Sequence, residues 1–162
     1  MQIELNKCEC DIARALARRK QSVLAQGTAW REKNGPQGQT FNDVEGFASE
    51  LAFCRLFNLY PDLDALNQKP PSHDVLLHDG RTVDVKCTAY ENGRLIVGAK
   101  KSLTVDLFAL MIGTMPTYRF AGFATGFDLM QPDRLTDYGH GPIYAMEQNE
   151  LEMEYCKQNL RA

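Results

Sequence analysis

Residues 72–87 bring together residue types that could do chemistry. Asp74 precedes a short apolar run, and Asp84 and Lys86 stand two positions apart in the run that follows. The Asp79-Gly80 pair between the runs predicts a β-hairpin with a two-residue turn. Because side chains alternate along a strand, Asp84 and Lys86 are expected on one face, with Asp74 near the same end of the hairpin. Core packing alone does not require two carboxylates and an ammonium group there, so we take the hairpin as the candidate active site.

Two predicted helices precede the hairpin. Apolar spacing predicts the first over about residues 6–33, with Arg14 and Arg18 among the basic residues on its polar side. These arginines form either a solvated helix face or a strip that contacts phosphates. The second helix, from about 41 to 57, carries Glu50 close to its apolar stripe. A carboxylate held near the core needs a group that compensates its charge, such as a cation.

The remainder of the chain predicts further strands and a closing helix. The expected strands cover 94–98, 105–112, 118–124 and 143–146, and the expected helix covers 148–160. The run at 105–112 is mostly apolar, as in a strand buried on both faces. This order predicts an α/β or α+β fold with the acidic hairpin at the centre of its sheet. We expect one domain over 1–162, with an N-terminal helix (1–34), a flexible loop (35–40) and a core (41–162).

Composition agrees with an ordinary globular protein. Of the 162 residues, 44% are hydrophobic and 24% are charged, which argues against global disorder. The net charge of −3 does not indicate a polyanion partner, so a nucleic-acid role would need a local basic patch. No apolar run is long enough to span a bilayer and no signal peptide is evident, so we expect a cytoplasmic protein with no membrane partner.

The five cysteines do not form a Cys-x-x-Cys pair, and their odd number favours free thiols. A metal or iron–sulfur cluster built from Cys8, Cys10 and Cys156 is the alternative. It is disfavoured because Cys8 and Cys10 would point to different faces of a helix.

The candidate site has the ligand types that bind a hard divalent cation. Converging carboxylates suit Mg²⁺ or Mn²⁺ better than zinc. Asp74 and Asp84 would be direct ligands, with the Val85 carbonyl as a further one, and Glu50 would bind a second ion or a metal water. Lys86 would orient or deprotonate the attacking water and neutralise charge on a phosphate. Together these roles describe phosphodiester hydrolysis.

The order of these residues resembles a known family. Glu50, then Asp74, then Asp84-Val85-Lys86 after nine intervening residues is similar to the PD-(D/E)XK nuclease superfamily, although Ser72-His73 replace the literal proline. The segment 118–124 and the residues that follow it resemble small phage and prophage members. The resemblance covers about residues 44 to 155.

This resemblance implies a restriction-endonuclease-like core, with a central mixed sheet of four to five strands flanked by helices. It implies a Mg²⁺- or Mn²⁺-dependent endonuclease that acts on DNA in the cytoplasm of a bacterial host. The implied catalytic residues are Glu50, Asp74, Asp84 and Lys86. Lys100 and Lys101 would contact the nucleic-acid backbone, unless they are simply solvated. A homodimer would let a cutter of this size reach both strands of a duplex.

Other interpretations stay open. The same fold could form a catalytically silent nucleic-acid-binding or protein-interaction module, or the acidic hairpin could be a solvated part of a structural protein. His73-Asp74 also matches the dipeptide of metal-dependent phosphohydrolases. That fold needs further histidines on helices, whereas the third histidine of this chain lies in a glycine-rich loop.

Overall fold

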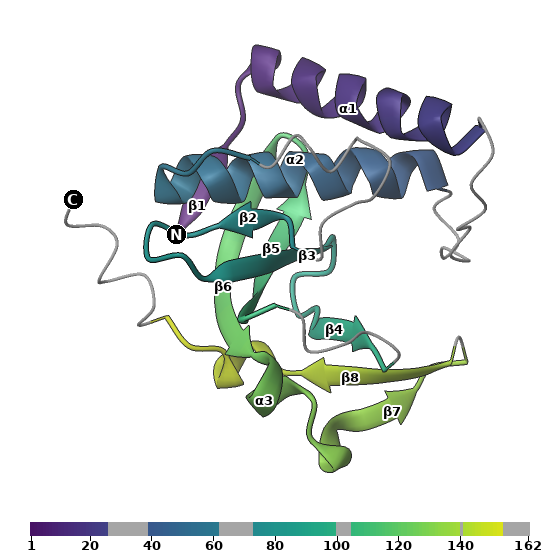
Figure 1. Cartoon of the computed structure of the whole chain (residues 1–162), viewed down its shortest axis with the longest axis vertical. Coiled ribbons are helices and arrows are strands. Elements are labelled where there is room, and N and C mark those ends of the chain that lie inside the picture. The colour runs from purple at the N-terminus through teal and green to yellow at the C-terminus, as the bar shows by residue number, and fades with distance from the viewer. Residues whose placement is uncertain (26–38, 62–72, 100–104, 140, 154–162) are drawn as a thin grey trace.

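The computed structural model describes residues 1–25, 39–61, 73–99, 105–139 and 141–153. Helices and strands alternate irregularly along them (Figure 1). Their bounds are β1 Gln2–Glu4, α1 Lys7–Ala25, α2 Gln39–Phe57, β2 Val75–Leu76, β3 Thr82–Thr88, β4 Leu95–Gly98, β5 Leu107–Thr114, β6 Thr117–Thr125, α3 Gly126–Leu129, η2 Pro132–Arg134, β7 Leu135–Asp137, β8 Pro142–Met146 and η3 Gln148–Glu150. None of the helices within these ranges is long and apolar enough to cross a membrane.

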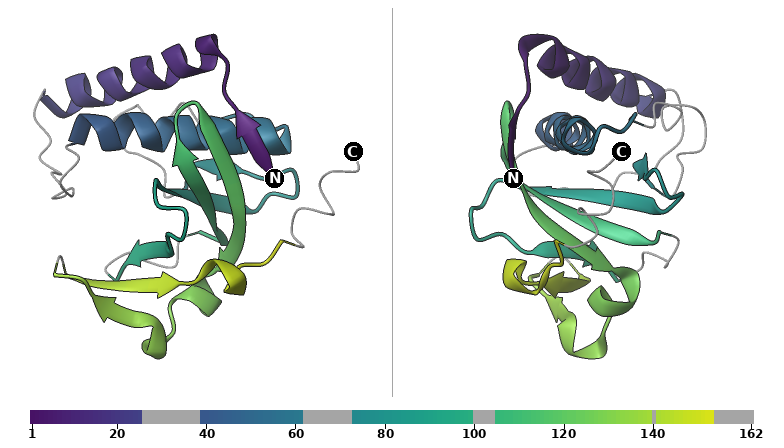
Figure 2. Two further views of the ribbon diagram at one scale, coloured as in Figure 1. Left: turned by 180° about the vertical axis from the view of Figure 1, so that it is seen from behind. Right: turned by 90° about the vertical axis from the view of Figure 1, so that its left-hand side faces the viewer.

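A five-stranded sheet in the order β1-β6-β5-β3-β2 forms the centre of the fold. Its β3 and β5 run parallel and its other neighbours run antiparallel, so the sheet is mixed. One face is covered by α2, and α1 lies on the outer side of α2 (Figures 1 and 2). The predicted α+β class with a central sheet of this size is confirmed, but the hairpin of β2 and β3 lies at one edge of the sheet and not at its centre as expected.

The core between α2 and the sheet explains why α2 forms where it does. Phe53 and Phe57, one helical turn apart, pack on Phe120 and Phe123 of β6, with ring centroids 5.2 to 6.0 Å apart between the helix and the strand. Small residues, among them Ala48 and Ala52, are fully buried and let α2 be packed from more than one side. This arrangement fixes the rotation of α2 and hence the side on which Glu50 lies.

The predicted hairpin is present, but its turn is longer than expected. Leu77 N donates to Arg81 O and Gly80 N donates to Leu77 O, so three residues, His78 to Gly80, connect the two strands. Gly80 has a φ of +88°, the left-handed conformation found at the last position of such three-residue loops. The expected two-residue turn was therefore wrong, whereas the antiparallel pairing of β2 with β3 was right.

The parallel pairing of β3 with β5 begins where Asp106, just before β5, accepts hydrogen bonds from Thr82 at the start of β3. Asp106 Oδ2 accepts hydrogen bonds from Thr82 N at 2.8 Å and Thr82 Oγ1 at 2.7 Å, and these hold the pKa of Asp106 below its usual range. Asp106→Ala is expected to lower the free energy of unfolding by about 1 kcal/mol at neutral pH.

The pH dependence of that loss has a defined sign. A carboxyl with a lowered folded pKa stabilises the fold above its unfolded pKa of about 3.9, and this stabilisation is lost as pH falls through the folded pKa. Urea unfolding of wild type and Asp106→Ala should therefore give curves that converge in acid. A difference that stays constant into acid would contradict this role of Asp106.

A second sheet, in the order β4-β8-β7, lies on the side of the central sheet away from the helices (Figure 2). The sequence predicted β4 and β8, but it did not predict that they leave the central sheet, nor did it predict β7 or β1. Leu95 and Val97 of β4 are buried against Phe108 and Leu110 of β5, which gives the fold a second core. The strand β5 is thus buried on both faces, as its apolar sequence predicted.

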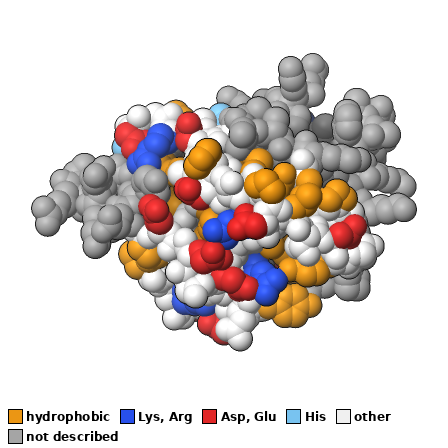
Figure 3. Space-filling view, turned by 90° about the horizontal axis from the view of Figure 1, so that it is seen from below, with side chains coloured by type: hydrophobic (Ala, Val, Ile, Leu, Met, Phe, Trp, Pro, Cys, Tyr) orange, Lys and Arg blue, Asp and Glu red, His pale blue; other side chains and the backbone are white. Residues whose placement is uncertain are grey.

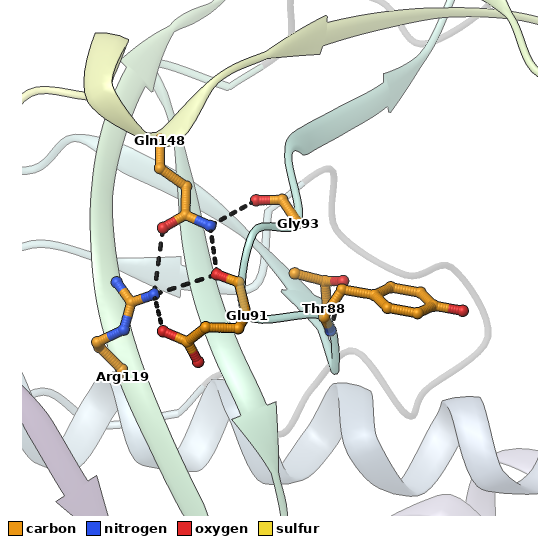
Figure 4. Close-up of polar contacts among 6 residues, drawn as sticks. Thr88, Glu91, Gly93, Arg119 and Gln148 are labelled. Atoms are coloured by element: carbon orange, nitrogen blue, oxygen red, sulfur yellow. Dashed lines mark hydrogen bonds and ion pairs between the residues drawn. The ribbon is translucent and has the colours of Figure 1, made fainter.

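Polar contacts hold the connection between the two sheets (Figure 4). Gln148 Nε2 donates to the carbonyl oxygens of Glu91 and Gly93 at 2.8 Å each, and Arg119 Nη2 donates to Glu91 Oε1 at 2.9 Å. A Cβ at Gly93 would lie 2.4 Å from Thr88 Cγ2, so the tight turn after β3 needs a glycine. The C-terminal end of the strand that carries Asp84 and Lys86 is fixed by these contacts.

The closing helix predicted at 148–160 is wrong for its described part. The chain forms a single 3₁₀ turn, η3, and then an extended segment in which Phe123 and Glu152 exchange two backbone hydrogen bonds. Those bonds use groups that a continuing helix would need for itself. Residues 154–160 lie outside the described residues.

The N-terminal predictions are confirmed in part. Helix α1 begins after a reciprocal cap in which Asn6 Oδ1 accepts from Glu9 N and Glu9 Oε2 accepts from Asn6 N. It is described to Ala25, so the rest of the expected helix lies outside the described residues. The same holds for the expected loop at 35–40, except that α2 already begins at Gln39.

Candidate active site at the edge of the central sheet

Asp84 and Lys86 lie on one face of β3, as the alternation of the strand predicts. The Lys86 ammonium donates to Asp84 Oδ1, and the two side chains are 32% and 2% exposed. Val83 and Val85 point to the opposite face and enter the core beneath α2. The buried carboxylate therefore meets solvent through its lysine, on the face of β3 away from α2.

Asp74 is positioned by the backbone of the same strand. Asp74 N donates to Val83 O at 2.9 Å, and Asp74 Oδ2 accepts from Val85 N at 2.7 Å. The N–H and C=O of a strand residue point to the same side of the strand. The Val85 carbonyl therefore faces the sheet edge where the Asp74 carboxylate lies.

Glu50 approaches this edge from α2. It is half-buried, and its pKa is raised well above the usual range, first by desolvation and second by the negative charge of Asp74. Lys20 and Lys86 act in the opposite direction. A partly buried carboxylate whose ionisation is opposed by a neighbouring negative charge is in an electrostatic environment that a bound cation would relieve.

Cys54, one helical turn after Glu50, is also buried and also lies near negative charge. Burial raises its pKa to about 12, and the charges of Glu50 and Asp74 add to the effect. The thiol is therefore protonated at neutral pH and is a poor nucleophile and a poor metal ligand. The carboxylates, and not this thiol, are therefore the candidate metal ligands.

The predicted ligands have suitable chemistry for a divalent cation, but the structure does not group them, because Asp84 lies on the face of β3 away from α2, the helix that carries Glu50. Every candidate donor is a carboxylate or carbonyl oxygen, the ligand type that Mg²⁺ and Mn²⁺ prefer. Within the described ranges, no three side chains of His, Cys, Asp or Glu are grouped as a metal site. Asp84 instead shares its carboxylate with Lys86, and Asp74 shares its own with Val85 N. A cation bound at Asp84 Oδ1 would compete with the Lys86 ammonium group for that oxygen.

Glu45, another acidic residue of α2, has a structural role. Glu45 Oε2 accepts from the hydroxyl of the buried Tyr118 at 2.6 Å and from Met115 N at 3.0 Å. It ties α2 to the turn between β5 and β6, and its contacts are separate from those of Glu50. Burial and the hydrogen bond to Glu45 raise the pKa of Tyr118, so the phenol stays protonated as the donor.

Glu45→Ala is expected to lower the free energy of unfolding by about 2 kcal/mol, because it leaves the Tyr118 hydroxyl and Met115 N without their acceptor. Thermal unfolding measures this loss. The double variant Glu45→Ala/Tyr118→Phe should lose less than the sum of the two single changes, because one hydrogen bond is removed only once. Strict additivity would contradict the assignment.

Two of the four basic residues predicted to bind nucleic acid, Arg14 and Arg18, lie among the residues that the structure describes. Arg14 and Arg18 are exposed on α1, and Arg14 Nη1 lies 2.9 Å from Asp11 Oδ1. Lys100 and Lys101 lie outside the described residues. On the face seen in Figure 3, the basic and acidic side chains of the described residues are interspersed and no large patch of one sign forms.

The second sheet contains a polar cavity of about 310 Å³, lined by Arg94, Arg134, Tyr138 and Glu150 among others. Its arginines are compensated: Arg94 lies 2.6 Å from Glu147 and Arg134 lies 3.0 Å from Glu150. This balance of charge makes the cavity a weaker candidate for binding a phosphate than the sheet edge.

The cysteine cluster considered from the sequence is not favoured by the two members that the structure describes. Cys8 is exposed and Cys10 is buried on α1, so they lie on different faces of the helix. Cys156 lies outside the described residues.

Comparisons of the chain with protein-family models, with curated proteins and with solved structures found no match. The fold defines an α+β protein with a mixed five-stranded central sheet and an acidic edge. Any finer assignment therefore rests on the chemistry of the chain's own residues.

Proposed function

We propose that the protein is a metal-dependent nuclease that hydrolyses phosphodiester bonds, with DNA as its substrate, on a restriction-endonuclease-like core. The observation that carries the proposal is the position of Asp74, whose carboxylate accepts a hydrogen bond from Val85 N on the strand that presents the paired Asp84 and Lys86. Two carboxylates and a partly exposed ammonium group at one edge have no role in the hydrophobic cores described above.

Each residue has a distinct task in this proposal. Asp74, Asp84, Glu50 and the Val85 carbonyl would hold Mg²⁺ or Mn²⁺, which when bound supplies Lewis-acid activation of water and phosphate. Lys86 donates a proton in a hydrogen bond to the attacking water or to a phosphate oxygen, and its charge offsets the charge that grows on the phosphate. Release of Lys86 from Asp84 would make that ammonium available.

The test is incubation of plasmid DNA with purified protein and Mg²⁺ or Mn²⁺, with EDTA as the control. We expect nicked or linear product with either cation and none with EDTA. Binding of DNA without cleavage under both cations would instead favour a catalytically silent nucleic-acid-binding module. If the protein neither binds nor cleaves DNA, the acidic edge does not have this function.

A further inference from the structure

Lys20 differs from the other basic residues of α1, because two groups on α2 hold its ammonium group. Lys20 Nζ lies 2.8 Å from Asp43 Oδ1 and 5.7 Å from the centre of the Phe47 ring. Its side chain nevertheless remains 47% exposed. An ammonium group has three N–H donors, so donors beyond the one used by Asp43 face solvent.

Asp43 gives Lys20 a fixed position. Asp43 is 8% exposed, and its Oδ2 has no hydrogen-bond partner among the residues that the structure describes. Removal of Lys20 from Asp43 would leave a buried carboxylate uncompensated, which is strongly unfavourable. Lys20 is thus a preorganised cation rather than a freely moving surface lysine.

The position that Asp43 fixes lies beside the candidate site. Asp43, Phe47 and Glu50 follow one another at spacings of four and three residues, which places them on one face of α2. Lys20 is held by Asp43 and Phe47, so its ammonium group lies on the same face of α2 as Glu50, within about two helical turns of it.

We propose that Lys20 is a second cationic residue of the candidate site, whose ammonium group, held by Asp43 and Phe47, binds a backbone phosphate of the nucleic acid beside the bond that is cut. This inference rests on the proposed nuclease function. A phosphate oxygen accepts from the solvent-facing N–H groups while Asp43 keeps its own contact. Because the contact is made before and during the reaction alike, it lowers KM and leaves kcat nearly unchanged.

The experiment compares Lys20→Met and Lys20→Arg with Lys7→Met, which removes an exposed lysine at the opposite end of α1, about 20 Å away along the helix. Cleavage of a fluorescein-labelled DNA duplex is measured with Mn²⁺. Lys20→Met should raise KM about tenfold with kcat within about twofold, and Lys20→Arg should restore most of the loss. Lys7→Met should match wild type.

A binding measurement gives a readout that does not need turnover. In the Asp84→Asn background with EDTA, adding Lys20→Met should weaken duplex binding about tenfold and reduce the slope of log affinity against log salt by about one. The melting temperature of each variant is measured alongside, so that a loss of folding is recognised.

The outcomes separate the two proposals. If wild type cleaves DNA, Asp84→Asn does not, and Lys20→Met equals Lys7→Met in KM and salt slope, the role of Lys20 is overturned while the nuclease function stands. A fall in melting temperature with unchanged binding would assign Lys20 to packing and would also overturn it. If wild type neither binds nor cleaves, the nuclease function fails, and the role of Lys20 fails with it.

Discussion

Asp84→Asn is expected to reduce DNA cleavage by about two to three orders of magnitude while the protein remains folded. The Asp84 side chain is 2% exposed, and asparagine has the same shape, so packing around it is kept. Lys86, its partner in the ion pair, is 32% exposed and can turn to water. The substitution therefore removes a negative charge from the edge at a small cost in stability.

Single-turnover cleavage with Mn²⁺ measures this loss, and Asp133→Asn, on an exposed turn of the second sheet, is the matched control. Asp133→Asn should cleave like wild type. Equal cleavage rates for Asp84→Asn and wild type would show that Asp84 takes no part in the reaction.

The role of Lys86 cannot be tested with a single substitution. Lys86→Met leaves the buried Asp84 carboxylate without its ammonium partner, which is expected to destabilise the fold by about 3 kcal/mol. A loss of activity in that variant could then be a loss of folding. The double variant Asp84→Asn/Lys86→Met removes both charges and should recover most of the stability while cleaving no DNA.

Glu50→Gln should make the protein more stable and inactive. Desolvation and the charge of Asp74 raise the pKa of Glu50, so the ionised glutamate is unfavourable in the fold at alkaline pH. The isosteric amide removes that charge and is expected to raise the free energy of unfolding by about 1–3 kcal/mol once the pH exceeds the raised pKa of Glu50. Cleavage with Mn²⁺ should fall by about two orders of magnitude, because a carboxylate oxygen of the proposed cation site is lost.

The pH dependence tests the cause of this gain. A glutamate whose folded pKa is raised lowers stability once the pH exceeds its unfolded pKa of about 4.3, and the penalty is complete above the folded pKa. The difference between Glu50→Gln and wild type, measured by urea unfolding, should therefore grow with rising pH and vanish in acid. Glu4→Gln, an exposed change, is the control and should give no trend. A destabilised Glu50→Gln at alkaline pH would contradict the account.

Local patterns in the sequence predicted the elements that carry the candidate site. Alternation around Asp84 and Lys86 predicted a shared face, and the structure pairs their charged groups. The apolar run in β5 predicted a strand buried on both sides, because that signal lies within the strand itself. Glu50 could be singled out because it borders an apolar stripe, which is also a local feature.

Features that depend on distant parts of the chain could not be predicted in this way. The turn of the hairpin is one residue longer because Leu77 pairs with Arg81, a register that the Asp-Gly pair permits but does not dictate. The expected C-terminal helix is replaced by a bridge between Glu152 and Phe123, a contact across the fold. Lys20 looked like its basic neighbours on α1, and only its contact with Asp43 on another helix separates it from them.

The most direct test of the central claim is the anomalous scattering from a crystal soaked in Mn²⁺. The account predicts a peak between the carboxylates of Asp74 and Asp84, with Glu50 bound directly or through one water and with the Lys86 ammonium moved off Asp84. A well-ordered site with Lys86 still paired to Asp84 and no peak would contradict it.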